Sequence, residues 1–123
     1  MSGQARIMVV DDDDMVASVV SLMLTELNYE SEVINSPNQA LERFRDSSND
    51  FDLVLTDLTM PEMNGVELAK HLKGIRDDII VAVMTGFGGA AESSADGEIV
   101  DQFLTKPLLL DDLSKALGDL LAR

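Results

Sequence analysis

The chain has 123 residues, enough for one hydrophobic core and too few for two ordinary domains, so we expect a single domain over residues 1–123. Its 9 Lys and Arg against 23 Asp and Glu give a formal net charge of −14, and the cations are scattered, which argues against direct nucleic-acid binding and against anionic membranes. The absence of cysteine excludes disulfides and thiolate metal sites, and no apolar stretch approaches the ~20 residues of a spanning helix. We therefore expect a soluble, cytoplasmic protein.

The first third of the chain alternates between strand and helix patterns. Residues 7–10 form a short apolar run, typical of a strand that is buried on both faces. Residues 16–27 carry apolar side chains at helical spacing, with Asn28 as a left-handed cap. Residues 29–34 alternate and predict a more exposed strand, and the Ser-Pro-Asn-Gln at 36–39 has the pattern of a capping box that opens a short helix.

The middle of the chain repeats the alternation. Apolar runs at residues 51–56 and 79–84 predict two further buried strands. Between them, residues 66–72 have helical spacing, and we expect Gly74 to stop that helix.

The last third contains a weak place in the pattern. Residues 86–97 hold four of the eight glycines, and each interior glycine costs a helix about 1 kcal/mol relative to alanine, so we expect a short or mobile helix there. A short strand at Gln102–Thr105 and a helix opened by Asp111 or Asp112 complete the chain. The alternation of strands and helices predicts an α/β fold, a doubly wound five-stranded parallel sheet with helices on both faces.

Polar side chains follow four of the predicted strands. In such sheets ligands bind outside the carboxyl ends of the strands. Asp11 and Asp12 follow the first strand, Asp57 the third, Thr85 the fourth and Lys106 the fifth. Carboxylates held together repel one another unless a cation or a proton intervenes, so we expect a cation where Asp11, Asp12 and Asp57 meet.

The residue types at this edge indicate phosphoryl chemistry. Three carboxylates without cysteine or a nearby histidine favour Mg²⁺ over zinc. Lys106 adds a mobile ammonium and Thr85 a hydroxyl donor, which suit an anionic phosphoryl group, and an aspartate can itself be the nucleophile. The next two acids, Asp13 and Asp14, are better explained as a solvated turn and helix cap.

Four segments carry a resemblance to a known family: residues 7–12 (IMVVDD), 52–65 (DLVLTDLTMPEMNG), 81–86 (VAVMTG) and 103–107 (FLTKP). In this order and spacing they resemble the response-regulator receiver domain of two-component signalling, similar to the stand-alone chemotaxis receiver. The resemblance extends from Ile7 to about Leu121. It implies a flavodoxin-like, three-layer (βα)5 sandwich with strand order 2-1-3-4-5.

The resemblance also implies roles for the acidic residues. Asp57 matches the phosphoacceptor that attacks a phosphohistidine on a partner protein. Asp12 matches the carboxylate that binds Mg²⁺ directly together with Asp57, while Asp11 acts through water. The backbone carbonyl of Thr59 completes the family's metal site.

Further roles are implied on the strands that follow. Thr85 and Lys106 match the pair that contacts the phosphoryl oxygens, and Thr85 also forms the family's switch together with the aromatic Phe103. The Lys106-Pro107 bond resembles one that is cis in the family. We accordingly expect a signalling module rather than an enzyme, one that catalyses only its own phosphorylation and dephosphorylation.

The resemblance names partners as well. The donor would be a sensor histidine kinase or a histidine phosphotransfer protein, and output would run through a downstream protein or a fused effector. The segment from Thr85 to Lys106 is Gly-rich and polar, whereas the family has a regular fourth helix there and uses it in the output face. Thr59 and Phe87 stand at positions that tune phosphate lifetime in the family.

Other interpretations of the sequence stay open. The same fold could serve as a non-phosphorylated interaction module whose acids are merely solvated. Residues 86–91 match the outline of a dinucleotide fingerprint, but the acid expected about 20 residues later is replaced by Lys106. A metal-dependent phosphatase would need a second Asp two residues after Asp57, where Thr59 stands. His71 is expected to be exposed and without function, and the seven methionines to be core filler.

Overall fold

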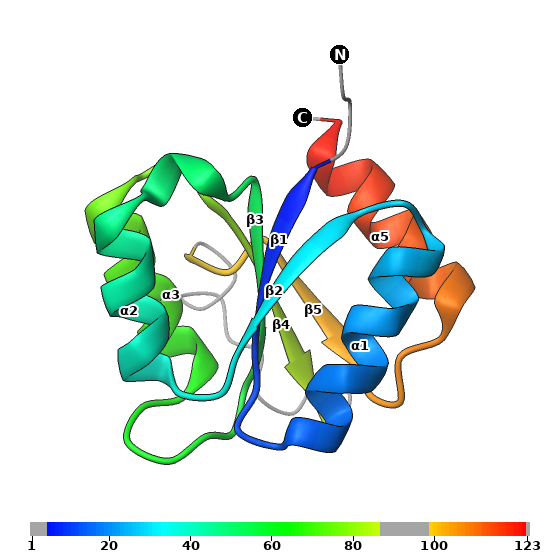
Figure 1. The fold of residues 1–123 in the computed structure, drawn as a ribbon, viewed down its shortest axis with the longest axis horizontal. Coiled ribbons are helices and arrows are strands. Elements are labelled where there is room, and N and C mark those ends of the chain that lie inside the picture. Colours follow the sequence, from blue (N-terminus) through cyan, green and yellow to red (C-terminus); the bar gives the residue numbers. More distant parts are fainter. Residues whose placement is uncertain (1–4, 87–98, 123) are drawn as a thin grey trace.

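A parallel sheet runs through the middle of the molecule. The computed structural model describes residues 5–86 and 99–122, and in this part of the chain five strands form one sheet. Their order is β2-β1-β3-β4-β5, as predicted, and every pairing is parallel (Figure 1). The strands are β1 (Arg6–Val10), β2 (Glu30–Ile34), β3 (Leu53–Asp57), β4 (Ile80–Thr85) and β5 (Gln102–Thr105).

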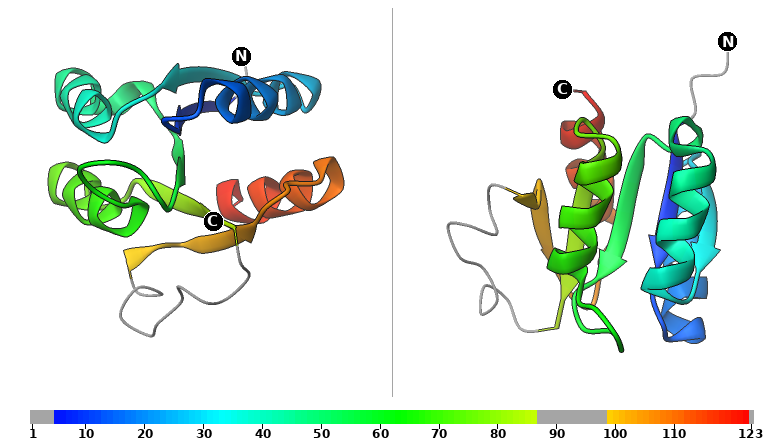
Figure 2. Two further views of the ribbon diagram at one scale, coloured as in Figure 1. Left: turned by 90° about the horizontal axis from the view of Figure 1, so that it is seen from below. Right: turned by 90° about the vertical axis from the view of Figure 1, so that its left-hand side faces the viewer.

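Helices cover both faces of the sheet (Figure 2). On one face lie α1 (Asp14–Glu26) and α5 (Leu110–Leu121), and on the other α2 (Pro37–Asp46) and α3 (Gly65–Ile75), with a short 3-10 turn η1 (Ser48–Asp50) after α2. Because side chains alternate along a strand, successive residues of β1 enter different cores. Ile7 and Val9 pack with α1 and α5, whereas Met8 and Val10 pack with α2 and α3. The three-layer sandwich is thus confirmed.

Side-chain caps begin the helices α1, α2 and α3. Asp13 begins α1 by accepting hydrogen bonds from the backbone of the next turn, and Ser36 begins α2 by accepting from the Gln39 amide at 3.3 Å. Asn28 follows α1 with φ at 69°, the left-handed conformation that its position predicts. A complete capping box occurs at Asn64, at the start of α3.

Two predicted helix boundaries are wrong, the end of α3 and the start of α5. Gly74 does not stop α3, which continues to Ile75; Ile75 packs against the core, and Arg76 beyond it fixes the exit by donating to the carbonyls of Ser48 and Phe51. That packing outweighs the cost of one exposed glycine inside the helix.

The last helix also begins differently from the prediction. The residue at its N-cap is Leu109, which makes no side-chain capping bond. Asp111 and Asp112 lie in the first turn instead, where negative charge interacts favourably with the positive end of the helix dipole.

Two expectations fall outside the described residues. The short or mobile helix expected at 86–97 and the glycine motif at 86–91 lie, apart from Gly86, in residues that the structure leaves undescribed, as does Phe87. In the two described ranges, no helix is long and apolar enough to cross a membrane.

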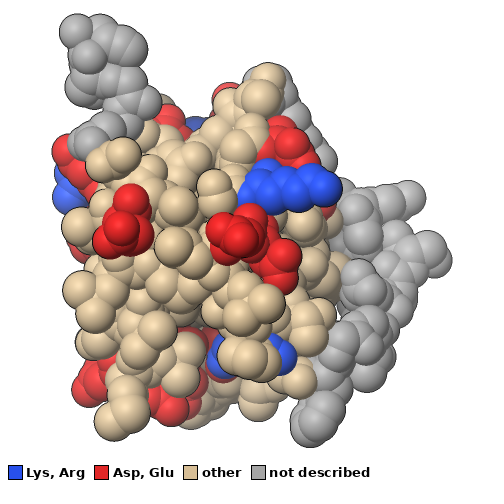
Figure 3. All heavy atoms as spheres, turned by 90° about the vertical axis from the view of Figure 1, so that its right-hand side faces the viewer, with Lys and Arg blue, Asp and Glu red and all other residues tan. Residues whose placement is uncertain are grey.

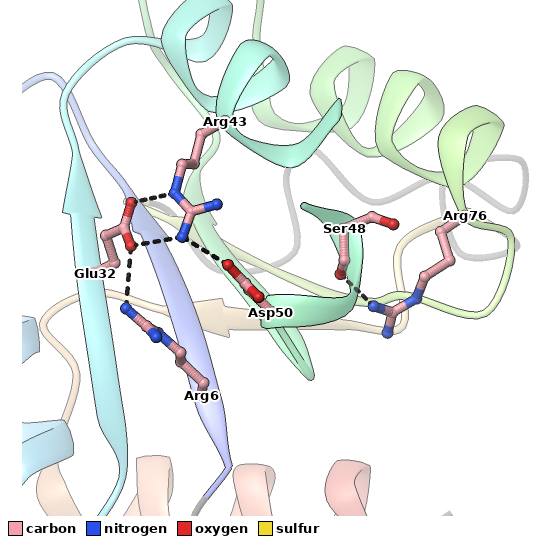
Figure 4. A network of polar contacts seen from close by, with 6 residues as sticks. All are labelled: Arg6, Glu32, Arg43, Ser48, Asp50 and Arg76. Atoms are coloured by element: carbon pink, nitrogen blue, oxygen red, sulfur yellow. Dashed lines mark hydrogen bonds and ion pairs between the residues drawn. The ribbon is translucent and has the colours of Figure 1, made fainter. Parts of the chain in front are cut away.

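A polar network secures the edge strand β2 (Figure 4). Glu32 accepts from Arg6 at 3.2 Å and from Arg43 at 2.8 Å, and Arg43 also binds Asp50 at 3.0 Å. Both guanidinium groups lie over the ring of Phe51, within 6 Å of its centroid. Hydrogen bonds from Arg43 to Glu32, and then to Asp50, raise the pKa of this arginine, so it stays charged. The network joins β1, β2, α2 and η1.

The start of α3 packs tightly against the end of β3. A Cβ atom added at Gly65 would lie 2.5 Å from the backbone oxygen of Asp57 and 3.1 Å from the Cα of Leu58. The Gly65 amide donates to the Leu58 carbonyl at 2.8 Å. Only glycine fits this approach, because both neighbours are backbone atoms that cannot move aside.

We predict that Gly65→Ala lowers the free energy of unfolding by about 2 kcal/mol, because the new methyl group must displace backbone. Gly74→Ala in the same helix is the matched control: nothing lies within 4 Å of its added Cβ, and alanine favours the helix by up to about 1 kcal/mol. Urea unfolding of both variants measures the difference. Equal stabilities would show that the close approach at Gly65 is unimportant.

Candidate functional site

The predicted site residues gather at the carboxyl edge of the sheet, the lower edge in Figure 1. Asp11 follows β1 directly, Asp57 is the last residue of β3, Thr85 is the last of β4, and Lys106 follows β5. Since all strands are parallel, their ends bring four segments of the chain to one place.

Three carboxylates meet at this edge. One carboxylate oxygen from each of Asp11, Asp12 and Asp57 lies within 4.8 Å of the other two. Asp11 and Asp57 are buried and Asp12 is exposed, so the cluster opens to solvent on the side of Asp12. Asp11 and Asp57 are held in this position because the backbone of each continues directly from a buried strand.

Lys106 brings positive charge to the cluster. Its Nζ lies 2.8 Å from Oδ1 of Asp57 and 3.7 Å from Oδ2 of Asp11. The Lys106 amide donates to the Thr85 carbonyl at 2.8 Å, which extends the pairing of β4 with β5 and fixes the base of the side chain. One ammonium thus serves two carboxylates, and the cluster keeps an excess of negative charge.

Asp11 bears the electrostatic cost of this arrangement. Its Oδ1 accepts a hydrogen bond from the Asp13 amide at 2.9 Å, whereas its buried Oδ2 has no hydrogen-bond partner among the described residues. Burial raises the pKa of the Asp11 carboxyl, and repulsion by Asp57 and by Asp12 adds to the rise. The Asp13 amide and Lys106 oppose it without cancelling it.

The donor set fits a hard divalent cation. Carboxylate oxygens are the ligands that Mg²⁺ prefers, and a buried oxygen without a hydrogen bond is one that an ion can take. The single histidine, His71, is exposed on α3, as predicted, and the chain has no cysteine, so neither an imidazole nor a thiolate joins the carboxylates at this edge. The residues present therefore fit Mg²⁺ at this cluster.

The other predicted site residues lie at the end of β4, in β5 and just after β3. Thr85 is buried at the end of β4, and Thr59 is exposed two residues beyond Asp57. Phe103 lies half-buried in β5 and packs against the core on the α2 and α3 side. The Lys106-Pro107 peptide bond is cis, as the resemblance implies.

Hydrogen bonds fix the backbone around Asp57. The Thr56 hydroxyl donates to the Asp57 carbonyl at 3.0 Å, and the Leu58 amide donates to the Met84 carbonyl at 2.9 Å. Together with the close approach of Gly65, these bonds leave the main chain of Asp57 little freedom.

An apolar groove opens beside the cluster, between α1 and the segment after β5. Its walls include Val16, Val19 and Leu108, and Lys106 lines it where it meets the cluster. Met15 also lines it and is 77% exposed, so the prediction that methionines are core filler is wrong at this position. Figure 3 looks at the side that carries α1 and α5, where uncharged side chains cover most of the described surface.

Nothing in the sequence pattern singled out Asn35. Its side-chain amide donates to the Asp11 carbonyl at 3.0 Å. The signal available was positional: Asn35 directly follows β2, so it stands at the same edge of the sheet as the other site residues.

Comparison with known proteins gives consistent matches. The family model described as "Response regulator receiver domain" matches residues 7–118. The transcriptional regulatory protein ZraR of Klebsiella oxytoca is 37% identical over 126 residues, covering 99% of this chain and 28% of ZraR. The autoinducer 1 sensor kinase/phosphatase LuxN of Vibrio campbellii is 30% identical, covering 92% of this chain and 13% of LuxN. The chain thus spans about a quarter or less of these relatives.

Solved structures agree with the fold. A response regulator receiver domain protein from Clostridium thermocellum has a TM-score of 0.89 at 28% identity, covering 97% of this chain and 95% of that one. The response regulator TrrA of Thermotoga maritima, solved in complex with Mg²⁺-BeF, has a TM-score of 0.85 at 26% identity, covering 95% of this chain and 99% of that one.

Burial of the Asp11 carboxylate and its repulsion by neighbouring carboxylates predict that Asp11→Asn stabilises the metal-free protein in a pH-dependent way. A raised pKa means that the native state holds a proton more tightly than the unfolded state, so this carboxylate costs stability above its folded pKa. At pH 7 with EDTA, Asn should raise the free energy of unfolding by roughly 1 kcal/mol or more, because it removes the buried charge.

The gain should shrink as the pH falls through the raised pKa, because Asp11 is then neutral in the wild type as well. Urea unfolding at pH 7 and at mildly acidic pH measures both values. A gain that is independent of pH, or a loss at pH 7, would contradict this account.

Proposed function

Because the chain belongs to the response regulator receiver domain family, we propose that it takes a phosphoryl group from the phosphohistidine of a partner protein onto Asp57. The observation that carries this proposal is the 2.8 Å contact between Lys106 Nζ and Asp57 Oδ1, in the cluster that Asp57 forms with Asp11 and Asp12. A buried carboxylate held by an ammonium is a nucleophile whose position is fixed before the donor arrives.

The transfer forms one bond and breaks one. An oxygen of Asp57 attacks the phosphorus while the bond from phosphorus to the histidine nitrogen breaks, and the nitrogen leaves with the electron pair. Lys106 stabilises negative charge on the phosphoryl oxygens, and the Thr85 hydroxyl donates to one of them. Positioning and charge neutralisation supply the catalysis, so the domain catalyses its own phosphorylation and dephosphorylation and acts on no other substrate.

The acidic cluster is proposed to bind Mg²⁺. Asp12 and Asp57 would bind the ion directly, Asp11 through water, and Thr59 through its backbone carbonyl. When bound, the ion supplies positive charge that offsets the repulsion between the carboxylates and the incoming phosphoryl group. The buried Oδ2 of Asp11, without a hydrogen bond in the described structure, supports this assignment.

Thr85 and Phe103 are proposed as the switch. Thr85 ends β4 next to the site, Phe103 lies on the adjacent strand, and the two strands are joined at the Lys106 amide. Movement of Thr85 toward a phosphoryl group would therefore shift β5 and change the surface that β5 shares with α5. That surface would transmit the signal to a downstream protein or to a fused effector.

We place the chain in the cytoplasm as a single receiver domain over residues 1–123, with a sensor histidine kinase or a histidine phosphotransfer protein as donor. Similar domains occur in two kinds of longer protein among the relatives, since ZraR is named a transcriptional regulatory protein and LuxN a sensor kinase/phosphatase. In either case the donor must bring its histidine to the edge of the sheet where Asp57 lies.

We propose that the partner segment that carries the phosphohistidine docks in the apolar groove beside the cluster. Met15 and Val19 are exposed along it, and Lys106 both lines the groove and contacts Asp57. Exposed apolar side chains next to a reactive carboxylate are typical of a surface that another protein covers.

We predict that acetyl phosphate with Mg²⁺ adds one phosphoryl group to the wild type and none to Asp57→Asn, because the amide cannot act as the nucleophile. Intact-mass spectrometry under non-acidic, rapid conditions reads the product, and beryllofluoride with Mg²⁺ gives a parallel NMR test. The exposed Asp77→Asn is the matched control and should behave as the wild type.

If the wild type and Asp57→Asn responded alike, the phosphoacceptor assignment would be wrong. If neither responded and Mg²⁺ did not bind, the chain would be an interaction module on the same fold.

We predict that Met15→Glu and Val19→Glu slow phosphoryl transfer from the phosphorylated histidine kinase that serves the wild type by roughly tenfold or more, because charge enters an apolar contact. Transfer from acetyl phosphate should be unchanged, since that donor needs no docking surface. Leu22 lies on the same helix, is 70% exposed and stands outside the groove, so Leu22→Glu is the control. Equal slowing by all three variants would argue against docking in the groove.

A further inference from the structure

Two asparagines flank the start of α2: Asn35 lies in the loop after β2, and Asn38 lies in the first turn of the helix. The side-chain amide of Asn35 donates to the Asp11 carbonyl at 3.0 Å, and that of Asn38 donates to Oε1 of Glu62, also at 3.0 Å. Both are exposed residues. Asn35 therefore touches the segment that carries two of the clustered carboxylates, whereas Asn38 binds the exposed side chain of Glu62, outside the cluster.

The bond from Asn35 replaces a missing rung of the sheet. The Asp11 amide donates to the Ile34 carbonyl at 3.1 Å, one residue past the last paired residues of β1 and β2. In a parallel pair the next rung would run from the Ser36 amide back to the Asp11 carbonyl. Ser36 instead begins α2 as its N-cap, and the side chain of Asn35 supplies the donor.

The carbonyl so bound belongs to the peptide that joins Asp11 to Asp12. On one side of this peptide the Asp11 side chain is buried against Lys106, and on the other the Asp12 side chain is exposed. The orientation of the peptide sets the direction in which the Asp12 side chain leaves the backbone. We propose that Asn35 is a positioning residue for the metal site, holding the Asp11-Asp12 peptide so that the Asp12 carboxylate stays beside Asp57.

Electrostatics explains why the peptide needs to be held. Three carboxylates with oxygens within 4.8 Å repel one another, and Lys106 contacts only Asp11 and Asp57. Asp12 is exposed, so moving away from the other two costs it no buried contact. A hydrogen bond that fixes its backbone keeps it in place before a cation arrives, which lowers the cost of binding the cation.

This inference rests on the function proposed above and is tested with the metal alone. Isothermal titration of Mg²⁺ into the metal-free protein should give a dissociation constant for Asn35→Ala about threefold to tenfold higher than for the wild type. The expected loss lies below the tenfold to hundredfold typical of residues that bind a ligand side chain directly, because Asn35 acts through the backbone. Asn38→Ala is the control, since it removes an equally long bond from the first turn of α2 to a side chain outside the cluster and should leave the constant unchanged.

A second variant and a stability measurement separate positioning from folding. Asn35→Ser, whose hydroxyl is too short to reach the carbonyl, should weaken Mg²⁺ binding as Asn35→Ala does. Urea unfolding in EDTA should show both variants folded. Unchanged Mg²⁺ affinity in the Asn35 variants, or equal weakening in Asn38→Ala, would overturn the inference.

The same measurements distinguish the absence of a Mg²⁺ site from the absence of a role for Asn35. A wild type that binds no Mg²⁺ would remove the proposed metal site and this inference with it. A wild type that binds Mg²⁺ and is phosphorylated by acetyl phosphate, with Asn35 variants of equal affinity, would leave the proposed function intact and reject only the role of Asn35.

Discussion

The repulsion among three carboxylates at one end of a buried sheet is the constraint around which this molecule is arranged. Asp11 and Asp57 cannot retreat, because each directly continues a strand whose side chains form the core. A single ammonium, from Lys106, stands against them, and one buried oxygen of Asp11 has no hydrogen bond within the described ranges. The rest of the fold supplies the stability that keeps this unfavourable arrangement intact, and a cation bound at the proposed site would relieve the repulsion.

Much of the fold could be predicted because its signals are local. Apolar runs, alternation and helical spacing located the five strands and four α-helices of the described residues, and Asn28 and Ser36 marked boundaries by well-understood backbone chemistry. The errors arose where packing decides. Gly74 was expected to end a helix that instead continues because Ile75 meets the core, and α5 begins at Leu109 without a capping side chain.

The candidate site was predictable to the extent that it consists of residues directly after buried strands. Parallel pairing alone brings Asp11, Asp57 and Lys106 together, so knowledge of the strands was enough to group them. Asn35 was missed because its contribution is a side chain that substitutes for a backbone rung, which depends on where α2 turns away. The exposure of Met15 was missed because the pattern of α1 is apolar on more than one side.

Lys106 lines the groove and also contacts Asp57, and this double membership has a thermodynamic consequence. Under the function proposed above, a protein seated in the groove and a phosphoryl group on Asp57 both act on the same ammonium. Their binding free energies are then coupled, and the coupling is reciprocal. If the phosphoryl group weakens the hold of the donor, the donor must destabilise the phosphorylated state by the same factor, so that transfer itself promotes the departure of the partner.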